Sequence, residues 1–166
     1  MGTPTPSRPY MPGYGTKGAA EGRGLLPWSW AEERLTTSHD YWLATVRADG
    51  RPHLMPVWGV WDGGALWFSS SKGSSKARNL TAEPRCSVAT DKAWEPVVIE
   101  GVAAVVTDND ALARFIGLEN EKYRTEFTVD FLDPDVNTTF RLAPTWAFSL
   151  TEDDFDGSPT RWSFET

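Results

Sequence analysis

Apolar residues in the first half of the chain gather in short runs that are separated by Asp-Gly turns. The runs Tyr41–Arg47, Pro52–Trp61 and Ala65–Ser69 are divided by Ala48-Asp49-Gly50 and by Asp62-Gly63-Gly64. Asp-Gly between two apolar runs is a strong hairpin signal, because glycine takes the positive φ that such a turn requires. The pattern therefore predicts three consecutive antiparallel strands.

The second of these runs is apolar on both of its faces. Leu54 and Trp58 alternate with Met55 and Val57, so neither face is left for water. An antiparallel strand that is apolar on both sides needs a cover on both sides. We expect a small barrel whose outer wall packs on a second copy of the chain, which makes the protein a homodimer.

The rest of the chain alternates between further strands and amphipathic helices. Expected helices are Trp30–Thr36 with Ser29 as its cap, Ser75–Glu83 with Ser74 as its cap, and a helix that starts at Asp108 or Asn109 and runs to Tyr123. Expected strands are Cys86–Thr90, Pro96–Thr107, Thr139–Leu142, Thr145–Leu150 and Thr160–Phe164. The fold class is mainly β with short helices (α+β).

The Gly- and Pro-rich residues 1–24 differ in composition from the rest of the chain. We expect them to form a flexible N-terminal arm, mobile unless another surface pins it. Residues 25–166 are long enough for one domain and too short for two.

Composition excludes several classes of function. A net charge of −7 argues against nucleic acid, whose binding needs clustered cations. The single cysteine, Cys86, falls in a strand and is expected to be an inert buried thiol. No apolar run approaches the ~20 residues that span a bilayer, and the N-terminus lacks a signal-peptide pattern, so we expect a cytoplasmic protein without a membrane partner.

The strongest candidate site is the hydroxyl-rich loop before the second helix. Hydroxyls, a glycine and the free N–H groups of the first helical turn suit an anion. Lys76 in that turn opposes the helix dipole, which suggests an external anion, although a capped surface helix with a solvated lysine explains the same residues. The loop reads Ser69-Ser70-Ser71-Lys72-Gly73-Ser74-Ser75-Lys76.

A second candidate lies in the second strand, where Pro56 and Gly59 interrupt an apolar run. Proline donates no ladder hydrogen bond and glycine packs nothing, so either a flat ring lies on this backbone or the strand turns a barrel corner. His39 and His53 have no carboxylates at ligand spacing, so no metal site is expected. No nucleophile motif appears either. An anion site and an apolar wall without acid–base residues are typical of a protein whose cofactor carries the reaction.

These pieces together resemble the flavin and deazaflavin oxidoreductase superfamily, whose best-known member is pyridoxamine 5′-phosphate oxidase. The matching stretches are WLATVRADGRPHLMPVWGVW, LWFSSSKGSSKARNLTAEPR and VVIEGVA, and LLPWSWAEERL and TRWSF resemble the actinobacterial branch. The resemblance implies a dimeric, FMN-binding split β-barrel with the cofactor between subunits. It implies that Ser70, Ser71, Ser74, Ser75 and Lys76 hold the phosphate, that Pro56, Val57, Trp58 and Gly59 lie along the ring, and that Trp94 and Trp162 approach from the partner.

The cofactor implied by the resemblance is the deazaflavin coenzyme F420 or, as the alternative, FMN. Ser75 stands where pyridoxamine-phosphate oxidases have a second basic residue, which argues against vitamin B6 oxidation. The resemblance to actinobacterial relatives with this kind of loop implies F420, whose longer acidic tail would reach Lys72 or Lys17 and Arg23 in the arm. The expected activity is hydride transfer between F420 and a small conjugated substrate, with no catalytic acid assigned. The rivals are an FMN-dependent oxidase or reductase and a non-enzymatic protein that binds haem or another tetrapyrrole.

Overall fold

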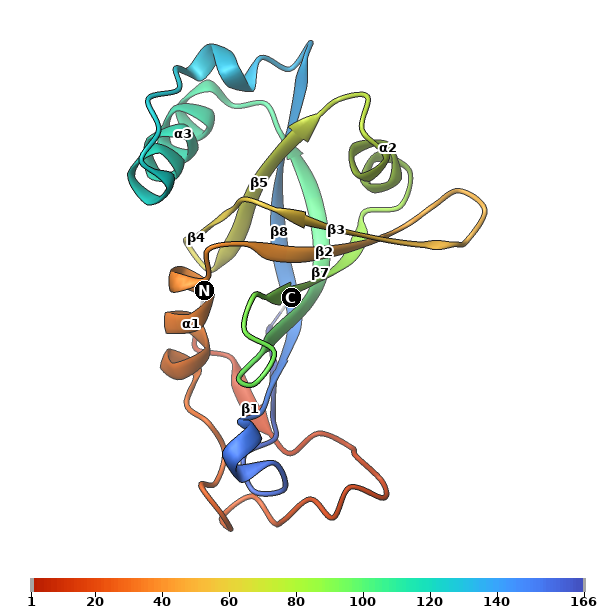
Figure 1. The fold of residues 1–166 in the computed structure, drawn as a ribbon, viewed down its shortest axis with the longest axis vertical. Coiled ribbons are helices and arrows are strands. Elements are labelled where there is room, and N and C mark those ends of the chain that lie inside the picture. The colour runs from red at the N-terminus through yellow and green to blue at the C-terminus, as the bar shows by residue number, and fades with distance from the viewer. Residues whose placement is uncertain (1, 166) are drawn as a thin grey trace.

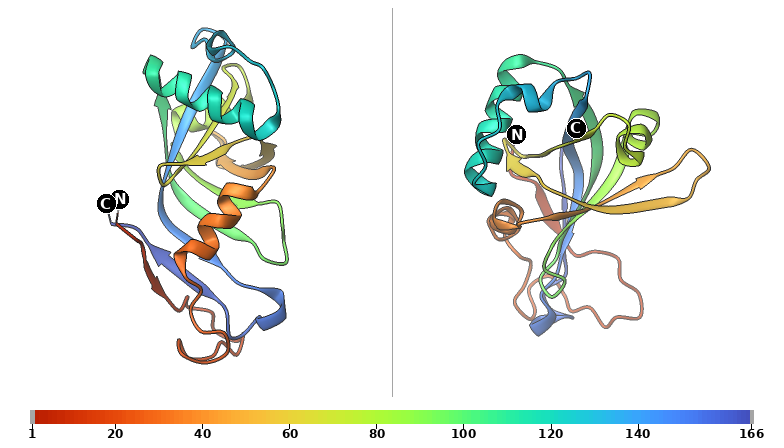
Figure 2. Two further views of the ribbon diagram at one scale, coloured as in Figure 1. Left: turned by 90° about the vertical axis from the view of Figure 1, so that its left-hand side faces the viewer. Right: turned by 45° about the horizontal axis from the view of Figure 1, so that its top comes forward.

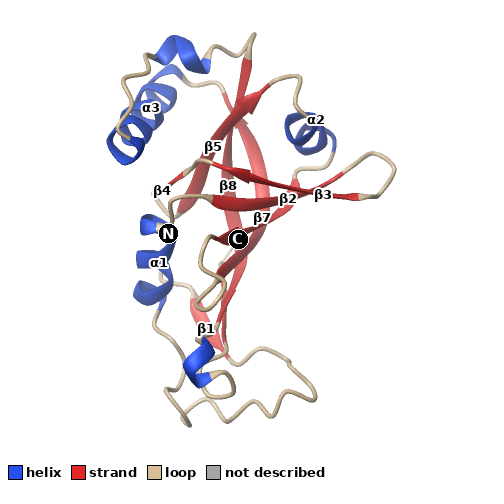
Figure 3. Cartoon of the chain, in the orientation of Figure 1, coloured by secondary structure: helices blue, strands red, loops and turns tan. Residues whose placement is uncertain are grey.

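The computed structural model describes residues 2–165 and shows an open antiparallel sheet with helices around it (Figures 1 and 3). Within these residues the sheet contains nine strands. The strands are β1 (Thr5–Ser7), β2 (Tyr41–Val46), β3 (Pro52–Val57), β4 (Val60–Asp62), β5 (Ala65–Ser71), β6 (Arg85–Thr90), β7 (Val97–Val106), β8 (Asn137–Ser149) and β9 (Thr160–Ser163). The helices are α1 (Trp28–Thr37), α2 (Ser75–Ala82), α3 (Asn109–Tyr123) and two 3-10 turns, η1 (Val129–Leu132) and η2 (Glu152–Asp154).

The strands follow the order β1-β9-β8-β7-β6-β2-β3, and β5 leaves this path by pairing with β8. The first half of β8 pairs with β5 and its second half with β9, so one long strand serves two parts of the sheet. Within the described residues β3 pairs only with β2, and β4 only with β5. The ring of strands is therefore open between β3 and β4 (Figure 2), which confirms the predicted split barrel.

The core lies inside the curved sheet, beneath α1 and α2. Its largest fully buried side chains include Trp162, Tyr41, Phe68, Phe140 and Leu43. Cys86 is also buried, and burial raises the pKa of its thiol to about 12, which agrees with the inert thiol expected from the sequence. A smaller apolar cluster under α3 packs Phe115 and Leu112 on Val60 of β4 and Leu132 of η1.

The second predicted strand, Pro52–Trp61, is two strands rather than one. The break falls at Trp58 and Gly59. Glycine is required at position 59, because a Cβ there would lie 2.9 Å from the Trp67 carbonyl oxygen and 3.3 Å from the Tyr41 ring. The chain leaves its pairing with β2 at Val57 and begins a new pairing with β5 at Val60. This is the barrel corner that the sequence analysis offered as one explanation.

The strands predicted on either side of Pro144 are, by contrast, a single strand. Strand β8 runs through Pro144, and the register against β7 shifts between Glu100 and Gly101. A Cβ on Gly101 would lie 2.1 Å from the Ala143 carbonyl oxygen, so glycine is required where the two backbones meet. The bulge absorbs a proline that would otherwise end the strand.

The helix starts agree with the sequence in two cases out of three. The Ser74 hydroxyl accepts a hydrogen bond from the Ala77 N–H at 3.1 Å and caps α2, as predicted. Asp108 caps α3 by accepting from the Ala111 N–H at 2.9 Å. Helix α1 was predicted wrongly at its start: it begins at Trp28 with Pro27 as its N-cap, so Ser29 lies inside the helix.

Removal of the Asp108 cap is expected to loosen α3. Asp108→Ala leaves the Ala111 N–H without its acceptor, which costs about 1 kcal/mol of unfolding free energy. Urea denaturation measures this loss, and Asp108→Asn, which retains the acceptor oxygen, should remain near the parent. An equal loss in both variants would show that the cap does not stabilise the helix.

The N-terminal arm packs on the C-terminal part of the chain. Strand β1 pairs with β9, and the Arg8 guanidinium donates to the Pro159 carbonyl oxygen at 2.6 Å. Lys17 forms an ion pair with Asp156 at 3.1 Å. The arm thus contacts the C-terminal part of the chain, at the end of the molecule opposite α2 (Figure 1).

Candidate functional site

The predicted anion site is a cluster of hydroxyls at the start of α2. The loop closes with the Ser74 N–H donated to the Ser71 carbonyl oxygen at 2.9 Å. The Ser70 and Ser74 hydroxyl oxygens lie 2.9 Å apart, which joins the end of β5 to the cap of the helix. Ser75 and Lys76 follow in the first turn and are partly buried. The structure thus brings five predicted residues into one short segment.

Lys76 is the cation of this cluster. Four residues later along α2, Leu80 is buried against the sheet, so Lys76 lies on the sheet-facing side of the helix. Among the described residues, no hydrogen bond or ion pair engages its ammonium group. A partly buried ammonium beside hydroxyl groups is well suited to an anionic ligand.

Helix α2 is tied to the strand pair that carries the predicted ring wall. The buried Asn79 side chain donates to the Thr45 hydroxyl on β2 at 2.9 Å, and that oxygen lies 3.5 Å from His53 Nδ1 on β3. From this link β3 continues through Pro56 to Val57. The start of α2 and the wall are therefore placed along the same pair of strands (Figure 1).

The wall itself ends in an aromatic stack. Pro56 is exposed and Val57 is buried, while the Trp58 ring is 42% exposed. Trp58 stacks on the Tyr123 ring of α3 with the centroids 4.2 Å apart and the planes 3° from parallel. One face of Trp58 is thus supported by Tyr123, and a flat ligand would find a rigid aromatic platform here.

Helix α3 also holds the Gly59 backbone. The Lys122 ammonium donates to the Gly59 carbonyl oxygen at 2.7 Å. The Tyr123 hydroxyl donates to the His39 carbonyl oxygen at 2.6 Å and lies 3.1 Å from the Gly59 carbonyl oxygen. The Gly59 N–H donates to the Tyr123 hydroxyl at 2.9 Å. Side chains of α3 therefore replace the ladder hydrogen bonds that the corner lacks, and they fix the position of the wall.

Two ionisable side chains of α3, the buried Glu119 and the partly buried Lys122, lie near this contact. Glu119 is 4% exposed and one of its carboxyl oxygens has no hydrogen-bond partner; burial raises the pKa of its carboxyl group to about 7. Burial likewise lowers the pKa of Lys122 to about 8, against the pull of Asp40, Asp91 and Glu119. Lys122 also donates to the Tyr41 hydroxyl at 2.9 Å. Lys122, which holds the Gly59 carbonyl oxygen, therefore has a pKa closer to neutral than an exposed lysine has.

Of the remaining predicted residues, Lys72 lies in the loop of the hydroxyl cluster and the others lie outside it. Trp94 is 57% exposed in the connection between β6 and β7, where it is accessible to a partner molecule. Trp162 is fully buried in its own chain, edge-on to Trp28 with the ring centroids 5.5 Å apart, so we omit it from the proposed site. Lys72 is exposed in the loop before α2. Lys17 and Arg23 are paired with Asp156 and Asp153.

The sequence analysis missed the residues of α3. Lys122 and Tyr123 lie 63 and 64 residues along the chain from Gly59, and no local motif marks them or Glu119. The one available signal was the charged Glu119 near Phe115 and Ile116 on the apolar face of an amphipathic helix, where a carboxylate is out of place.

Residues 2–165 show no metal cluster and no membrane-spanning helix. They contain no group of three or more His, Cys, Asp or Glu side chains that could hold a metal ion. None of the helices among residues 2–165 is both long and apolar enough to cross a membrane.

With this geometry in view, comparison with known proteins defines the class. The chain belongs to the pyridoxamine 5′-phosphate oxidase family, whose model matches residues 31–150. No curated protein matches the sequence.

Solved structures agree with this assignment. A conserved hypothetical protein, Rv2991 from Mycobacterium tuberculosis, is 26% identical, with 78% of this chain and 87% of that one covered and a TM-score of 0.68. A protein described as an F420 reductase is 27% identical, with 70% and 94% covered and a TM-score of 0.58. HutZ, a haem storage protein from Vibrio cholerae, is 24% identical, with 70% and 86% covered and a TM-score of 0.56, and shows the fold alone.

Proposed function

We propose that this protein is an oxidoreductase that binds the deazaflavin coenzyme F420 and transfers a hydride between it and a small conjugated substrate. One observation carries the proposal: Lys76, whose ammonium no described residue engages, follows the Ser70–Ser74 hydroxyl pair in the first turn of α2, and α2 is tied to the strand pair that leads to the Trp58 wall. An anion site joined to an aromatic platform fits a cofactor with a phosphate and a flat ring system. The 27% identity to an F420 reductase supports the choice of F420.

The residues present fit such a group at both of its ends. Lys76 supplies the charge for a phosphate, and Ser70, Ser74 and Ser75 supply hydroxyl donors beside it. Trp58 offers a flat apolar face, and the glycine at position 59 keeps the backbone close to Trp67 and Tyr41. When bound, the reduced deazaflavin supplies the hydride, and the acceptor takes up a proton as well.

The work of the protein in this proposal is orientation and exclusion of water. Trp58, supported by Tyr123, holds the ring plane, and Lys122 keeps the Gly59 carbonyl oxygen in place behind it. We assign no catalytic acid. Both histidines lie near the wall: His53 Nδ1 on β3 is 3.5 Å from the Thr45 hydroxyl, and the His39 ring packs edge-on against Tyr123 with the centroids 5.3 Å apart.

The preference for F420 over FMN rests on the residues around the phosphate site. Lys76 is the only cation in the first turn of α2, because position 75 is serine. The Lys72 side chain is unpaired among the described residues and is available for the acidic tail of F420. Lys17 and Arg23, in contrast, are engaged by acidic residues of the same chain, in the arm that packs on the C-terminal part of the chain, so they play no part in the proposal.

A second copy of the chain is part of the proposal. Trp42, Val46 and Leu54 lie on the outer face of the β2–β3 pair and are 45%, 42% and 57% exposed. Val102, 43% exposed, extends this surface to β7. Such an exposed apolar face is typical of an interface. In a homodimer the partner would cover it and Trp94 would be available to the cofactor of the other subunit.

Binding titrations of the purified apoprotein test the proposal. The absorption spectrum is recorded first, and F420, FMN and haem are then titrated separately. We expect saturable F420 binding that is tighter than FMN binding, together with a dimer by sedimentation. Preference for FMN would move the assignment to the FMN-dependent alternative. Binding of haem alone would favour a carrier, and binding of none of the three would refute the proposed site.

A further inference from the structure

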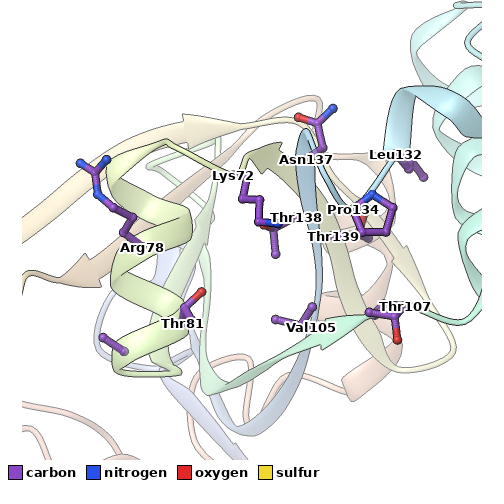
Figure 4. Close-up of a pocket in the computed structure, with 12 residues that line it drawn as sticks. Lys72, Arg78, Thr81, Val105, Thr107, Leu132, Pro134, Asn137, Thr138 and Thr139 are labelled. Carbon is purple, nitrogen blue, oxygen red and sulfur yellow. The ribbon is translucent and has the colours of Figure 1, made fainter.

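A cavity of about 580 Å³ opens between α2, the ends of β7 and β8, and η1 (Figure 4). Val105 of β7 and Leu132 of η1 contribute its apolar wall, and Thr81 and Arg78 contribute the side of α2. The volume is in the range of small-molecule sites, which are mostly apolar with a few placed polar groups. The cavity therefore has the size and the lining of a ligand site.

The charge of this lining is opposite to that of the whole protein. Lys72 and Arg78 both line the cavity, and no carboxylate is among the described residues that do so, although the chain carries a net charge of −7. Figure 4 shows the Lys72 side chain directed into the space between α2 and β8. One Arg78 nitrogen donates to the Gly73 carbonyl oxygen at 2.6 Å, and its other N–H groups remain available.

A buried hydroxyl in the same lining lacks a partner. Thr139 of β8 is 2% exposed, and its hydroxyl oxygen makes no hydrogen bond with the protein. An unsatisfied hydroxyl in an apolar surrounding is unfavourable, so a group that hydrogen-bonds to it would be held there. The cavity thus combines two cations at its edge with an unsatisfied polar atom on its wall.

The cavity is separate from the proposed phosphate site. It meets α2 through Arg78 and Thr81, which lie on one side of the helix. Lys76 precedes Arg78 by two residues, about 200° around the helix, and lies on the side that faces the sheet. Of the residues predicted to bind the cofactor, only Lys72 lines the cavity.

We propose that this cavity binds a small amphipathic carboxylate in addition to the cofactor, with Lys72 as the one residue that the proposed F420 tail would share with it. The carboxylate group pairs with Lys72 and Arg78, and the apolar body lies against Val105 and Leu132. Acidic amphiphiles are selected over neutral or cationic ones, because the lining carries positive charge alone.

Ligand titrations followed by NMR test the charge selection. Decanoate is the probe, at concentrations below micelle formation, and decyltrimethylammonium is the control with the same chain length and the opposite charge. We expect one saturable decanoate site per chain and no saturable site for the cation. Equal binding of the two probes, or no saturable decanoate binding, would overturn the proposal.

Three variants locate the site. Lys72→Met is expected to weaken decanoate binding about 10-fold, the scale of one charge-assisted hydrogen bond, while Lys17→Met at the opposite end leaves it unchanged. Val105→Trp fills the cavity from a position that is 51% exposed and should abolish decanoate binding. The affinity of Val105→Trp for the cofactor, F420 or FMN, should equal that of the parent. A loss of cofactor affinity in this variant, or displacement of decanoate by FMN, which lacks the acidic tail, would show that the cavity belongs to the cofactor site.

Discussion

Replacement of Lys76 by alanine is expected to weaken cofactor binding by about 10- to 150-fold, and to leave the fold intact. The ammonium group would form a charge-assisted hydrogen bond with the phosphate, worth about 1.5–3 kcal/mol, and each 1.4 kcal/mol is a factor of ten in affinity. Since no group in the described chain engages Lys76, its removal strands no partner. Titration of the purified variant with F420 and FMN measures the change.

Two matched variants separate the role of this charge from general effects. Lys76→Arg keeps the cation and should retain most of the affinity. Lys17→Ala removes a lysine of the arm that is paired with Asp156, and it should bind the cofactor as the parent does. Unchanged cofactor affinity in Lys76→Ala would show that the phosphate of the cofactor does not bind at the start of α2. A loss of cofactor affinity in Lys17→Ala would show that the N-terminal arm contributes to the cofactor site.

The strands and the start of α2 could be predicted because their signals are local. Glycine in the turns after β2 and β4 takes positive φ, 84° at Gly50 and 58° at Gly63, as the Asp-Gly tracts indicated. Ser74 caps α2 through its own neighbours. In each case the residues that determine the conformation lie within four positions of one another, so the sequence contains the whole interaction.

The two errors in the strands arose where a distant residue determines the local conformation. The break between β3 and β4 depends on Tyr123 and Lys122, which bind the Gly59 backbone from another helix. The continuity of β8 through Pro144 depends on Gly101 in the neighbouring strand. Neither the break between β3 and β4 nor the continuity of β8 can be recognised from the residues of the strand itself.

The candidate site divides in the same way. Its proposed anion-binding half is one segment, Ser70–Lys76, which the sequence indicates by itself. The aromatic half needs α3 to stack Tyr123 on Trp58, and only the structure reveals this contact. Trp162 shows the opposite case: a tryptophan near the C-terminus was assigned to the cofactor by resemblance, but its ring fills the core of its own chain.

Glu119→Gln is expected to stabilise the protein by about 1–2 kcal/mol at pH 8 and to have little effect at pH 5. The Glu119 pKa is raised by burial to about 7 in the folded chain, from 4.5. Between these values the unfolded chain has released this proton and the folded chain still holds it, so stability falls as the pH rises. Above pH 7 the full cost of burying the Glu119 carboxylate is present. The expected gain of about 1–2 kcal/mol is already reduced to allow for partial solvation of this group. Glutamine carries no charge and avoids that cost.

Lys122 acts with the opposite dependence. Burial lowers its pKa to about 8 in the folded chain, from 10.5. Below pH 8 both states are charged and the full cost of burying the ammonium is present. Between pH 8 and 10.5 the folded chain has released its proton while the unfolded chain keeps it, so stability rises with pH. The two side chains together therefore give the folded protein a minimum of stability between about pH 7 and 8.

Urea denaturation of the parent and Glu119→Gln from pH 4.5 to 8 tests this expectation. Glu121→Gln, an exposed carboxylate on the same helix, is the matched control, and its curve should run parallel to that of the parent. Equal stability of the parent and Glu119→Gln at pH 8 would show that the Glu119 carboxylate is accommodated without cost. Because Lys122 donates to Gly59 while Glu119 lies one turn before it, the same variant also reports on the wall. A cofactor affinity that changes with pH in the parent and not in Glu119→Gln would show that the buried pair controls the position of the Trp58 platform.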